Sequence, residues 1–387
     1  MKRISRLGLL TAMSLALELP AQAQAQAQAA DPAATAARIA PAALRQDLLR
    51  GIYEIAAAPG QGAVFVASTP AFEEGRPGYV DLLDATDLRP LRRIELPRRA
   101  FALATDAKRG RLYVGNTMDG SLSVLDMSSG LPLGTIQLGK PDGEGFEHTR
   151  MIEVDPDSGR VYVTGPSDAG TVWIVDPVQG NAVQRIDNAG LWTAGLALDA
   201  RAGRVYATNG GMNEVLVLDA ATGARLASFS TGDTKAEGQD ASRHFFVNAA
   251  LDDTGKRLFA VDANSGQVYV FDTANGAVLA KVPVGLGALD VIHAPGTGQI
   301  IVTYRGASRE KPDGTGGVVL LKDSDYTRLA DLSLPVHPNS LALSEDGTAL
   351  FVSIKAPMAD HHPLYRRDGL DTVLRLDLQR LAGILAE

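Results

Sequence analysis

Histidine is scarce in this chain, and its placement raises the first chemical question. Five of the six histidines, His148, His244, His337, His361 and His362, fall between the apolar runs. Imidazoles that converge with a carboxylate can hold a transition-metal ion. No two of them have a spacing that fixes ligation locally, so polar packing of loops is the competing interpretation. We therefore predict no metal site and no cofactor, and we keep a metal-assisted lyase or hydrolase using His148, His244 and His337 as the alternative function.

Carboxyl groups offer a second kind of chemistry. Glu54, Glu147 and Asp290 are candidates for acid–base partners near Arg150 or His244. The chain has no cysteine, no Gly-x-Ser-x-Gly motif, no phosphate-binding loop and no compact carboxylate pair. Thiolate chemistry and disulfides are therefore excluded. We interpret these carboxyl groups as partners in structural salt bridges and predict no catalytic residue.

Basic and aromatic residues together give a partial signal for nucleic-acid binding, which uses cations interleaved with stacking rings. The basic residues are Arg98, Arg99, Arg150, Arg243, Arg305, Arg309, Arg366 and Arg367. The aromatic residues are Tyr53, Phe101, Trp192, Phe245 and Tyr365. A net charge of −8 argues against strong non-specific binding, so the cations would have to be concentrated in one place.

A repeat of about 48 residues organises the chain. Its core is an apolar triplet, found as Val64-Phe65-Val66, Leu112-Tyr113-Val114, Val161-Tyr162-Val163, Val205-Tyr206-Ala207, Leu258-Phe259-Ala260, Ile300-Ile301-Val302 and Leu350-Phe351-Val352. A turn precedes each triplet, and in most units an Asp-x-x-x-Gly turn follows a second strand. Four antiparallel strands per unit, seven times over, predict an all-β, seven-bladed β-propeller.

The two ends of the repeat array predict how the ring closes. The seventh unit lacks a clear fourth strand, while an unmatched strand-like segment, residues 44–51, precedes the first unit. We expect this N-terminal segment to supply the outer strand of the last blade, which removes unpaired strand edges. The propeller is therefore assigned to residues 44–387.

One face of this propeller is the predicted binding face. If the strands of a blade are named A to D from the axis outward, the D–A and B–C connections share a face, and rigid scaffolds carry binding residues on such loops. The equivalent position of each D–A connection is Gly51, Arg99, His148, Trp192, Phe245, Gly287 and His337. Three B–C connections are long, at residues 69–78, 305–316 and 355–371. The predicted ligand-binding residues are Tyr53, Glu54, Arg99, His148, Arg150, Trp192, Arg243, His244, Phe245, Asn248, His337 and Asn339.

The N-terminus has the layout of a secretory signal. Lys2, Arg3 and Arg6 precede an apolar run, and Ala-Gln-Ala triplets follow it. The run is too short to span a membrane. We assign residues 1–29 to a signal peptide and residues 30–43 to a flexible lead-in, and we expect a periplasmic protein that does not insert into the membrane.

The segments "LYVGN", "VYVTG" and "VYATN" resemble the YVTN-repeat β-propeller family. Polar matches at "RHFFVN" and "HPNSLALS" extend the resemblance over roughly residues 44–378. It implies a periplasmic, non-enzymatic propeller, with single-stranded DNA binding associated with the family. The chain departs from this pattern in its three long B–C connections and in Arg98-Arg99. The expected partner is a nucleic-acid strand, a peptide or an envelope protein, and we expect a monomer.

Overall fold

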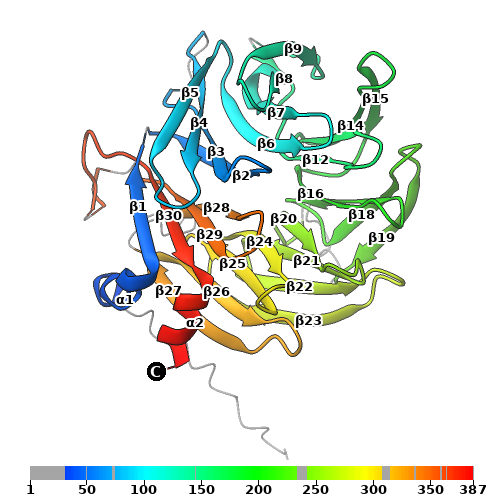
Figure 1. Ribbon diagram of the computed structural model, residues 1–387. Coiled ribbons are helices and arrows are strands. Elements are labelled where there is room, and N and C mark those ends of the chain that lie inside the picture. The colour runs from blue at the N-terminus through cyan, green and yellow to red at the C-terminus, as the bar shows by residue number, and fades with distance from the viewer. Residues whose placement is uncertain are drawn as a thin grey trace, which may run out of the picture.

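The apolar triplets form the second strand of each blade in a ring of antiparallel sheets. The structure is a computed structural model, and it describes residues 31–48, 50–71, 75–143, 145–232, 242–306, 314–334, 337–357, 360–362 and 364–386. The proposed signal peptide, residues 1–29, lies outside these ranges. The described residues form seven four-stranded sheets around a central axis (Figure 1). The predicted seven-bladed β-propeller is confirmed.

The blades follow one another along the chain. Blade one contains β2 (Ile52–Ala58), β3 (Ala63–Ser68), β4 (Gly78–Asp84) and β5 (Pro90–Leu96). Blade two contains β6 (Ala100–Asp106), β7 (Arg111–Asn116), β8 (Ser121–Asp126) and β9 (Pro132–Gln137). Blade three contains β12 (Ile152–Val154), β13 (Val161–Gly165), β14 (Thr171–Asp176) and β15 (Ala182–Asp187). A two-stranded hairpin, β10 (Pro141–Asp142) and β11 (Gly145–Phe146), lies between blades two and three.

The second half of the ring repeats this order. Blade four contains β16 (Thr193–Asp199), β17 (Arg204–Asn209), β18 (Glu214–Asp219) and β19 (Arg225–Ser230). Blade five contains β20 (Phe246–Leu251), β21 (Arg257–Asp262), β22 (Gln267–Asp272) and β23 (Val278–Pro283). Blade six contains β24 (Ala288–Ala294), β25 (Gln299–Tyr304), β26 (Gly316–Lys322) and β27 (Arg328–Leu334).

Blade seven joins the two ends of the chain. It contains β28 (Pro338–Leu343), β29 (Ala349–Ile354), β30 (Thr372–Asp377) and, as its outer strand, β1 (Ala43–Asp47). β1 pairs antiparallel with β30, from Ala43 opposite Leu376 to Asp47 opposite Thr372. The predicted closure of the ring by an N-terminal strand is confirmed.

The segment predicted to be a flexible lead-in contains ordered structure instead. Residues Pro32–Ile39 form helix α1, and a 3-10 turn, η1 (Ala40–Ala42), leads into β1. Asp31 caps the helix by accepting a hydrogen bond from the Ala33 N–H, and Pro32 starts it with a fixed backbone angle. The alanines favour a helix, and Ile39 is buried. An Ala-rich segment therefore becomes part of the fold because Ile39 enters the core, and Thr35 on the same helix is buried as well.

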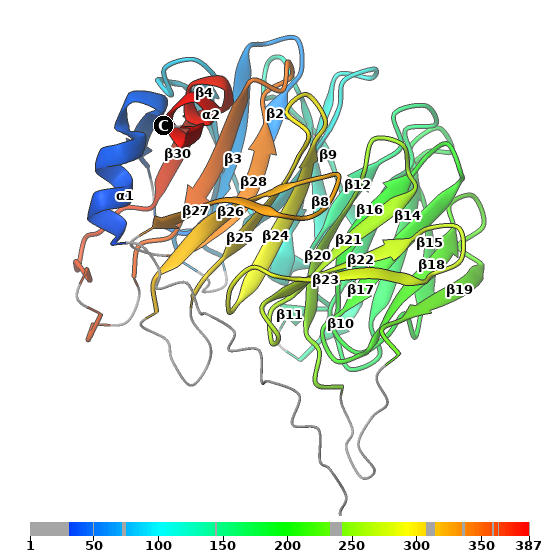
Figure 2. The ribbon, with the colours of Figure 1, turned by 90° about the horizontal axis from the view of Figure 1, so that it is seen from below.

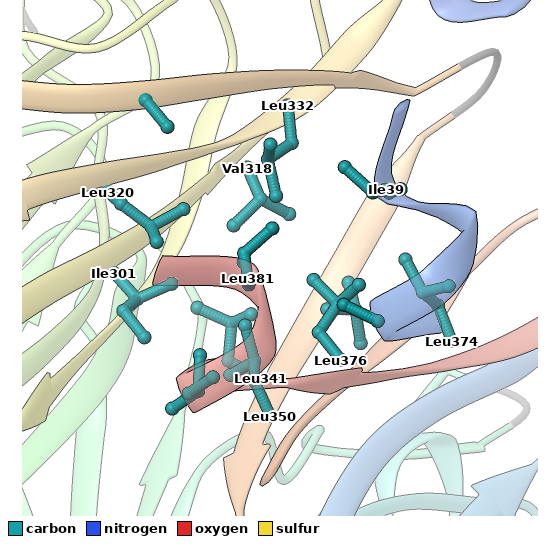
Figure 3. Close-up of a cluster of buried hydrophobic side chains, with 14 of the residues drawn as sticks. Ile39, Ile301, Val318, Leu320, Leu332, Leu341, Leu350, Leu374, Leu376 and Leu381 are labelled. Carbon is teal, nitrogen blue, oxygen red and sulfur yellow. The ribbon is translucent and has the colours of Figure 1, made fainter. Parts of the chain in front are cut away.

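A second helix, α2 (Leu378–Ala386), continues directly from β30 and was not predicted. Asp377 accepts a hydrogen bond from the Arg380 N–H at the start of this helix. Leu381 of α2 and Ile39 of α1 enter one apolar cluster with Val318 and Leu332 of blade six (Figure 3). The two helices lie together at one edge of the disc (Figure 2). They cover the junction between blades six and seven, where the ring closes.

The repeated aspartates serve the turns. Asp126 accepts hydrogen bonds from the Ser129 N–H and from both serine hydroxyl groups of its turn, and these bonds lower its pKa to about 2. Asp219 makes equivalent bonds to Ala221 and Thr222. The turns on one face of the disc are therefore stabilised by hydrogen bonds to these aspartate side chains. In the described part of the chain, no helix is long and apolar enough to cross a bilayer.

Candidate functional site

The inner strands carry irregularities where they enter the ring. The pairing register shifts near the start of β2, β6, β16, β20, β24 and β28. In β2 the shift falls between Ile52 and Ile55, and in β20 between Phe246 and Ala249. An extra residue in one strand redirects the neighbouring side chains. The predicted site residues Tyr53, Glu54 and Asn248 lie within these shifted stretches.

The equivalent position of each D–A connection, which we call the ring position, is structurally equivalent in five blades. In these blades the residue three places after the apolar triplet donates its backbone N–H to the backbone carbonyl of the residue at the ring position. The donor–acceptor pairs are Thr69 to Gly51, Gly210 to Trp192, Ala263 to Phe245, Arg305 to Gly287 and Lys355 to His337, at 2.8–3.0 Å. These residues therefore lie at the same level of the ring, at the opening of the channel on the D–A face. We call this opening the mouth.

Hydroxyl groups of the second strands join neighbouring blades just below the mouth. Thr164 accepts a hydrogen bond from the Met151 N–H of its own blade and donates to the Ala194 carbonyl of the next blade. The same two bonds are made by Thr208, Thr303 and Ser353. The hydroxyl group at this position of the repeat therefore links neighbouring blades next to the mouth.

Two cations from adjacent blades lie in the mouth. Lys355 follows β29 of blade seven, and its Nζ is 3.4 Å from the centre of the Tyr53 ring. Arg305 follows β25 of blade six and is half-buried. Within the described ranges, neither side chain forms a hydrogen bond or an ion pair. The nearby Asp371 is occupied, because its two oxygens accept the N–H groups of Ile52 and Ala356.

Burial lowers the pKa of each of these basic groups. It lowers the pKa of Lys355 to about 7, with the positive charge of Arg305 adding to the effect and Asp371 opposing it. Burial also lowers the pKa of Arg305. His337 has its pKa lowered to about 4 by burial and by Arg305. Burial therefore disfavours the charged form of all three groups, and Asp371 is a carboxylate whose charge acts on Lys355.

A chain of hydrogen bonds crosses the channel beneath the mouth. Arg150 of blade three donates from Nη1 to the Asn248 amide oxygen of blade five at 3.0 Å. Asn248 donates to Asp290 of blade six at 2.8 Å, and Asp290 accepts the Leu341 N–H of blade seven at 2.8 Å. Glu54 of blade one accepts a bond from the Ser340 hydroxyl at 3.4 Å. We call the Arg150–Asn248–Asp290 chain the polar bridge.

The remaining predicted site residues divide into exposed and structural groups. Trp192 and Phe245 are 47% and 37% exposed on adjacent blades, and His148 and Arg243 are also exposed. Tyr53 packs against Phe101, with ring centres 4.4 Å apart. Asn339 is buried, and its amide donates to the Tyr53 carbonyl at 3.4 Å. Exposed rings and enclosed cations thus share one rim.

Two of the predicted site residues serve the fold. Arg99 is buried and forms two hydrogen bonds with the Asp119 carboxylate, at 2.7 and 3.1 Å. His244 is 1% exposed, and its ring bonds Asp262 at 2.6 Å and stacks on Phe246. Its other ring nitrogen lies 3.4 Å from the Thr231 hydroxyl. Both ring nitrogens of His244 therefore have partners inside the fold. The described residues contain no group of three or more His, Asp or Glu able to hold a metal ion.

Sequence reasoning overlooked Lys355 as a site residue and considered Arg305 only as part of a basic composition. A positional signal was present. Three residues after the apolar triplet, the seven units have Thr69, Thr117, Pro166, Gly210, Ala263, Arg305 and Lys355. Only the last two of these residues are basic, and they belong to adjacent blades. Comparing equivalent repeat positions would have identified both.

Comparisons with known proteins agree with this architecture. No family model matches the chain. It is 30% identical over 315 residues to the protein YncE of Salmonella typhi. The aligned residues cover 81% of this chain and 85% of that protein. It is 30% identical over 317 residues to YncE of Escherichia coli strain K12, with the same two shares. Both relatives are described as uncharacterized.

A solved structure extends the likeness at the level of the fold. The structure of U3-55K superposes with a TM-score of 0.64 over 88% of this chain and 99% of that one. The two sequences are only 14% identical, so this likeness shows the fold alone. The identity to the two bacterial proteins, over most of both chains, shows more. The chain belongs to the YncE family of seven-bladed β-propellers.

Proposed function

We propose that this protein is an exported, non-enzymatic binding protein whose mouth holds a single-stranded nucleic acid. One observation carries the proposal. Lys355 and Arg305 are half-buried cations that form no ion pair with a described residue, and they share a rim with the exposed rings of Trp192 and Phe245. Burying an unpaired cation is costly unless a ligand supplies the opposite charge. A phosphate group would supply it.

The chemistry of a single strand fits both halves of this rim. Its backbone carries one negative charge per nucleotide, and its unstacked bases can lie on aromatic side chains. Trp192 and Phe245 offer such faces on neighbouring blades, and Arg243 is exposed beside Phe245. The net charge of −8 predicts weak attraction elsewhere on the surface. Binding should therefore depend on the mouth and weaken with salt.

Fluorescence anisotropy with a labelled oligothymidylate tests the proposal. We expect Lys355→Gln and Arg305→Gln each to weaken binding about tenfold, since each removes one charge-assisted contact. Lys256→Gln is the matched control, because Lys256 is an exposed lysine in the A–B turn of blade five, at the opposite face. Wild-type affinity in both mouth variants would overturn the proposal. An acidic peptide that binds in a Lys355-dependent way, when the oligonucleotide does not, would replace the nucleic acid as partner.

The alternative of a metal-assisted lyase or hydrolase has less support. It needs His148, His244 and His337 as ligands, yet His244 is buried in hydrogen bonds to Asp262 and packed on Phe246. His148 is exposed. Metal analysis of the purified protein after incubation with zinc would test this alternative, and stoichiometric zinc lost in His337→Ala would restore it.

Export is a separate part of the proposal. It rests on the basic N-terminus, the short apolar run and the Ala-Gln-Ala triplets that follow it. Fractionation of cells that express the full chain, with mass spectrometry of the mature N-terminus, tests it. A protein recovered from the cytoplasm with residues 1–29 intact would contradict it.

A further inference from the structure

A cavity occupies the channel on the other side of the polar bridge. Its volume is about 470 Å³, and residues of all seven inner strands line it. It reaches Val154 and Leu251, the last residues of β12 and β20, where the A–B turns begin. The cavity therefore lies toward the face opposite the mouth. We call it the bore.

The wall of the bore combines three carboxyl groups with aliphatic side chains, and its accessible surface is more polar than apolar. Glu54, Glu153 and Asp290 come from blades one, three and six, and most of the remaining lining is alanine, valine, leucine and isoleucine. Arg150 is a cation whose charge lowers the pKa of Glu54. Its guanidinium donates to the Asn248 amide and to the Ala194 carbonyl, and it forms no salt bridge with these carboxyl groups.

Two of the three carboxyl groups have unused hydrogen-bonding capacity. Glu54 is only 9% exposed, and one of its oxygens accepts the long bond from Ser340. Its other oxygen has no partner in the described part of the chain, and the side chain lines the bore. Glu153 has no hydrogen bond or ion pair to any described residue. Asp290, in contrast, is held by Asn248 and by two backbone N–H groups.

The geometry identifies the kind of ligand that fits. A metal ion would need several donors at one point, and no group of three or more His, Asp or Glu in the described ranges can provide them. An organic ammonium needs only one or two acceptors, and an attached apolar chain would bury the aliphatic wall. We propose that the bore is a second binding site, which takes a primary ammonium group carried on an apolar chain, with the ammonium at Glu54 and Glu153.

This site predicts that binding releases protons. Burial, with the charge of Asp290, raises the pKa of Glu54 to about 8, and the same two causes raise the pKa of Glu153 to about 7. The groups that face Glu54 are Asp290 on β24, Ser340 on β28, and Arg150 and Glu153 at β12. Near pH 7 these acids are partly protonated, and an ammonium ligand favours their ionised forms. Binding should therefore release protons.

Isothermal titration calorimetry with n-hexylammonium chloride tests the inference. The wild-type protein should bind it, whereas n-hexanoate, which has the same chain and the opposite charge, should not bind. At pH 7 the heat of binding should differ between Tris and phosphate buffers, because the released protons are taken up by the buffer. Glu54→Gln and Glu153→Gln keep the side-chain shape, and each should weaken binding about tenfold. Glu95→Gln, at an exposed position on β5, is the matched control and should leave binding unchanged.

Several outcomes would overturn the site. They are absence of hexylammonium binding to the wild-type protein, equal binding in both Glu→Gln variants, and binding without proton release. A heat from calcium chloride that is lost in Glu54→Gln would assign the bore to a metal ion instead. Thermal melting of each variant separates lost binding from lost folding, and binding of the oligonucleotide at the mouth is scored independently.

Discussion

The mouth and the bore share the same seven inner strands, yet they have opposite chemistry. The mouth gathers Lys355, Arg305 and exposed aromatic rings. The bore gathers Glu54, Glu153 and Asp290 beside aliphatic side chains. Burial acts on both in the same way, because it disfavours whichever form is charged. It lowers the pKa of Lys355 to about 7 and raises the pKa of Glu54 to about 8.

The difference also involves the polar bridge. Its Arg150 is a cation that acts on Glu54 and lowers the pKa of that carboxyl group. Asn248 and Asp290 link Arg150 to blades five and six, and both also line the bore. Lys355 and Arg305 have no such hydrogen-bonded link to the described residues. Two regions with cations in one and carboxyl groups in the other are suited to two different ligands.

The largest expected effect comes from removing the scaffold common to both regions. Deletion of residues 43–47 removes β1 and leaves the β30 edge unpaired. We expect aggregation or loss of cooperative thermal unfolding, with loss of both oligonucleotide and hexylammonium binding. Differential scanning calorimetry and light scattering measure this. Melting identical to wild type would mean that β1 is not needed to close the ring.

Reversing one charge separates the mouth from the rest of the molecule. Lys355→Glu replaces an attractive charge with a repulsive one, so we expect oligonucleotide affinity to fall about a hundredfold at constant salt. Lys256→Glu makes the same change in net charge at the opposite face and should have little effect. If both variants lose affinity equally, net charge rather than the mouth determines binding.

Breaking the polar bridge should affect stability and the bore together. Arg150→Gln removes a guanidinium that bonds the Asn248 amide and the Ala194 carbonyl, and we expect a loss of about 1–3 kcal/mol in the free energy of unfolding. Arg150 also lowers the pKa of Glu54, so that pKa should rise further in the variant. Urea unfolding measures the first effect, and the pH midpoint of hexylammonium binding measures the second. An unchanged midpoint would show that Arg150 does not act on Glu54.

The smallest predicted effect is a pH dependence of opposite sign in the two regions. Lys355 loses its proton as the pH rises through about 7, so oligonucleotide affinity should fall by up to about tenfold between pH 6 and 8. Glu153 and Glu54 ionise through about 7 and 8, so hexylammonium affinity should rise over the same interval. Titrations at fixed ionic strength measure both profiles. Parallel profiles would contradict the assignment of opposite charges.

Much of the scaffold could be predicted because it is repetitive. Seven apolar triplets and their Asp turns report local strand pairing, and the N-terminal strand follows from counting strands in the last unit. Helix α1 could not be predicted in this way. Its sequence, PAATAARI, is simple, and its order depends on the burial of Ile39 against blade six. The same limit applies to α2, which Leu381 anchors to that cluster.

The sequence by itself determined the ring, its closure and the level of the channel at which the D–A residues meet, because strand alternation and turn chemistry are local. Only the tertiary structure decided which of those residues remain open to a ligand. His244 and Arg99 form ion pairs with Asp262 and Asp119, whereas Lys355 and Arg305 form no ion pair with a described residue. Whether a charged side chain has a partner of opposite charge depends on residues that the fold brings together from distant blades. A local sequence pattern does not contain the distances between them.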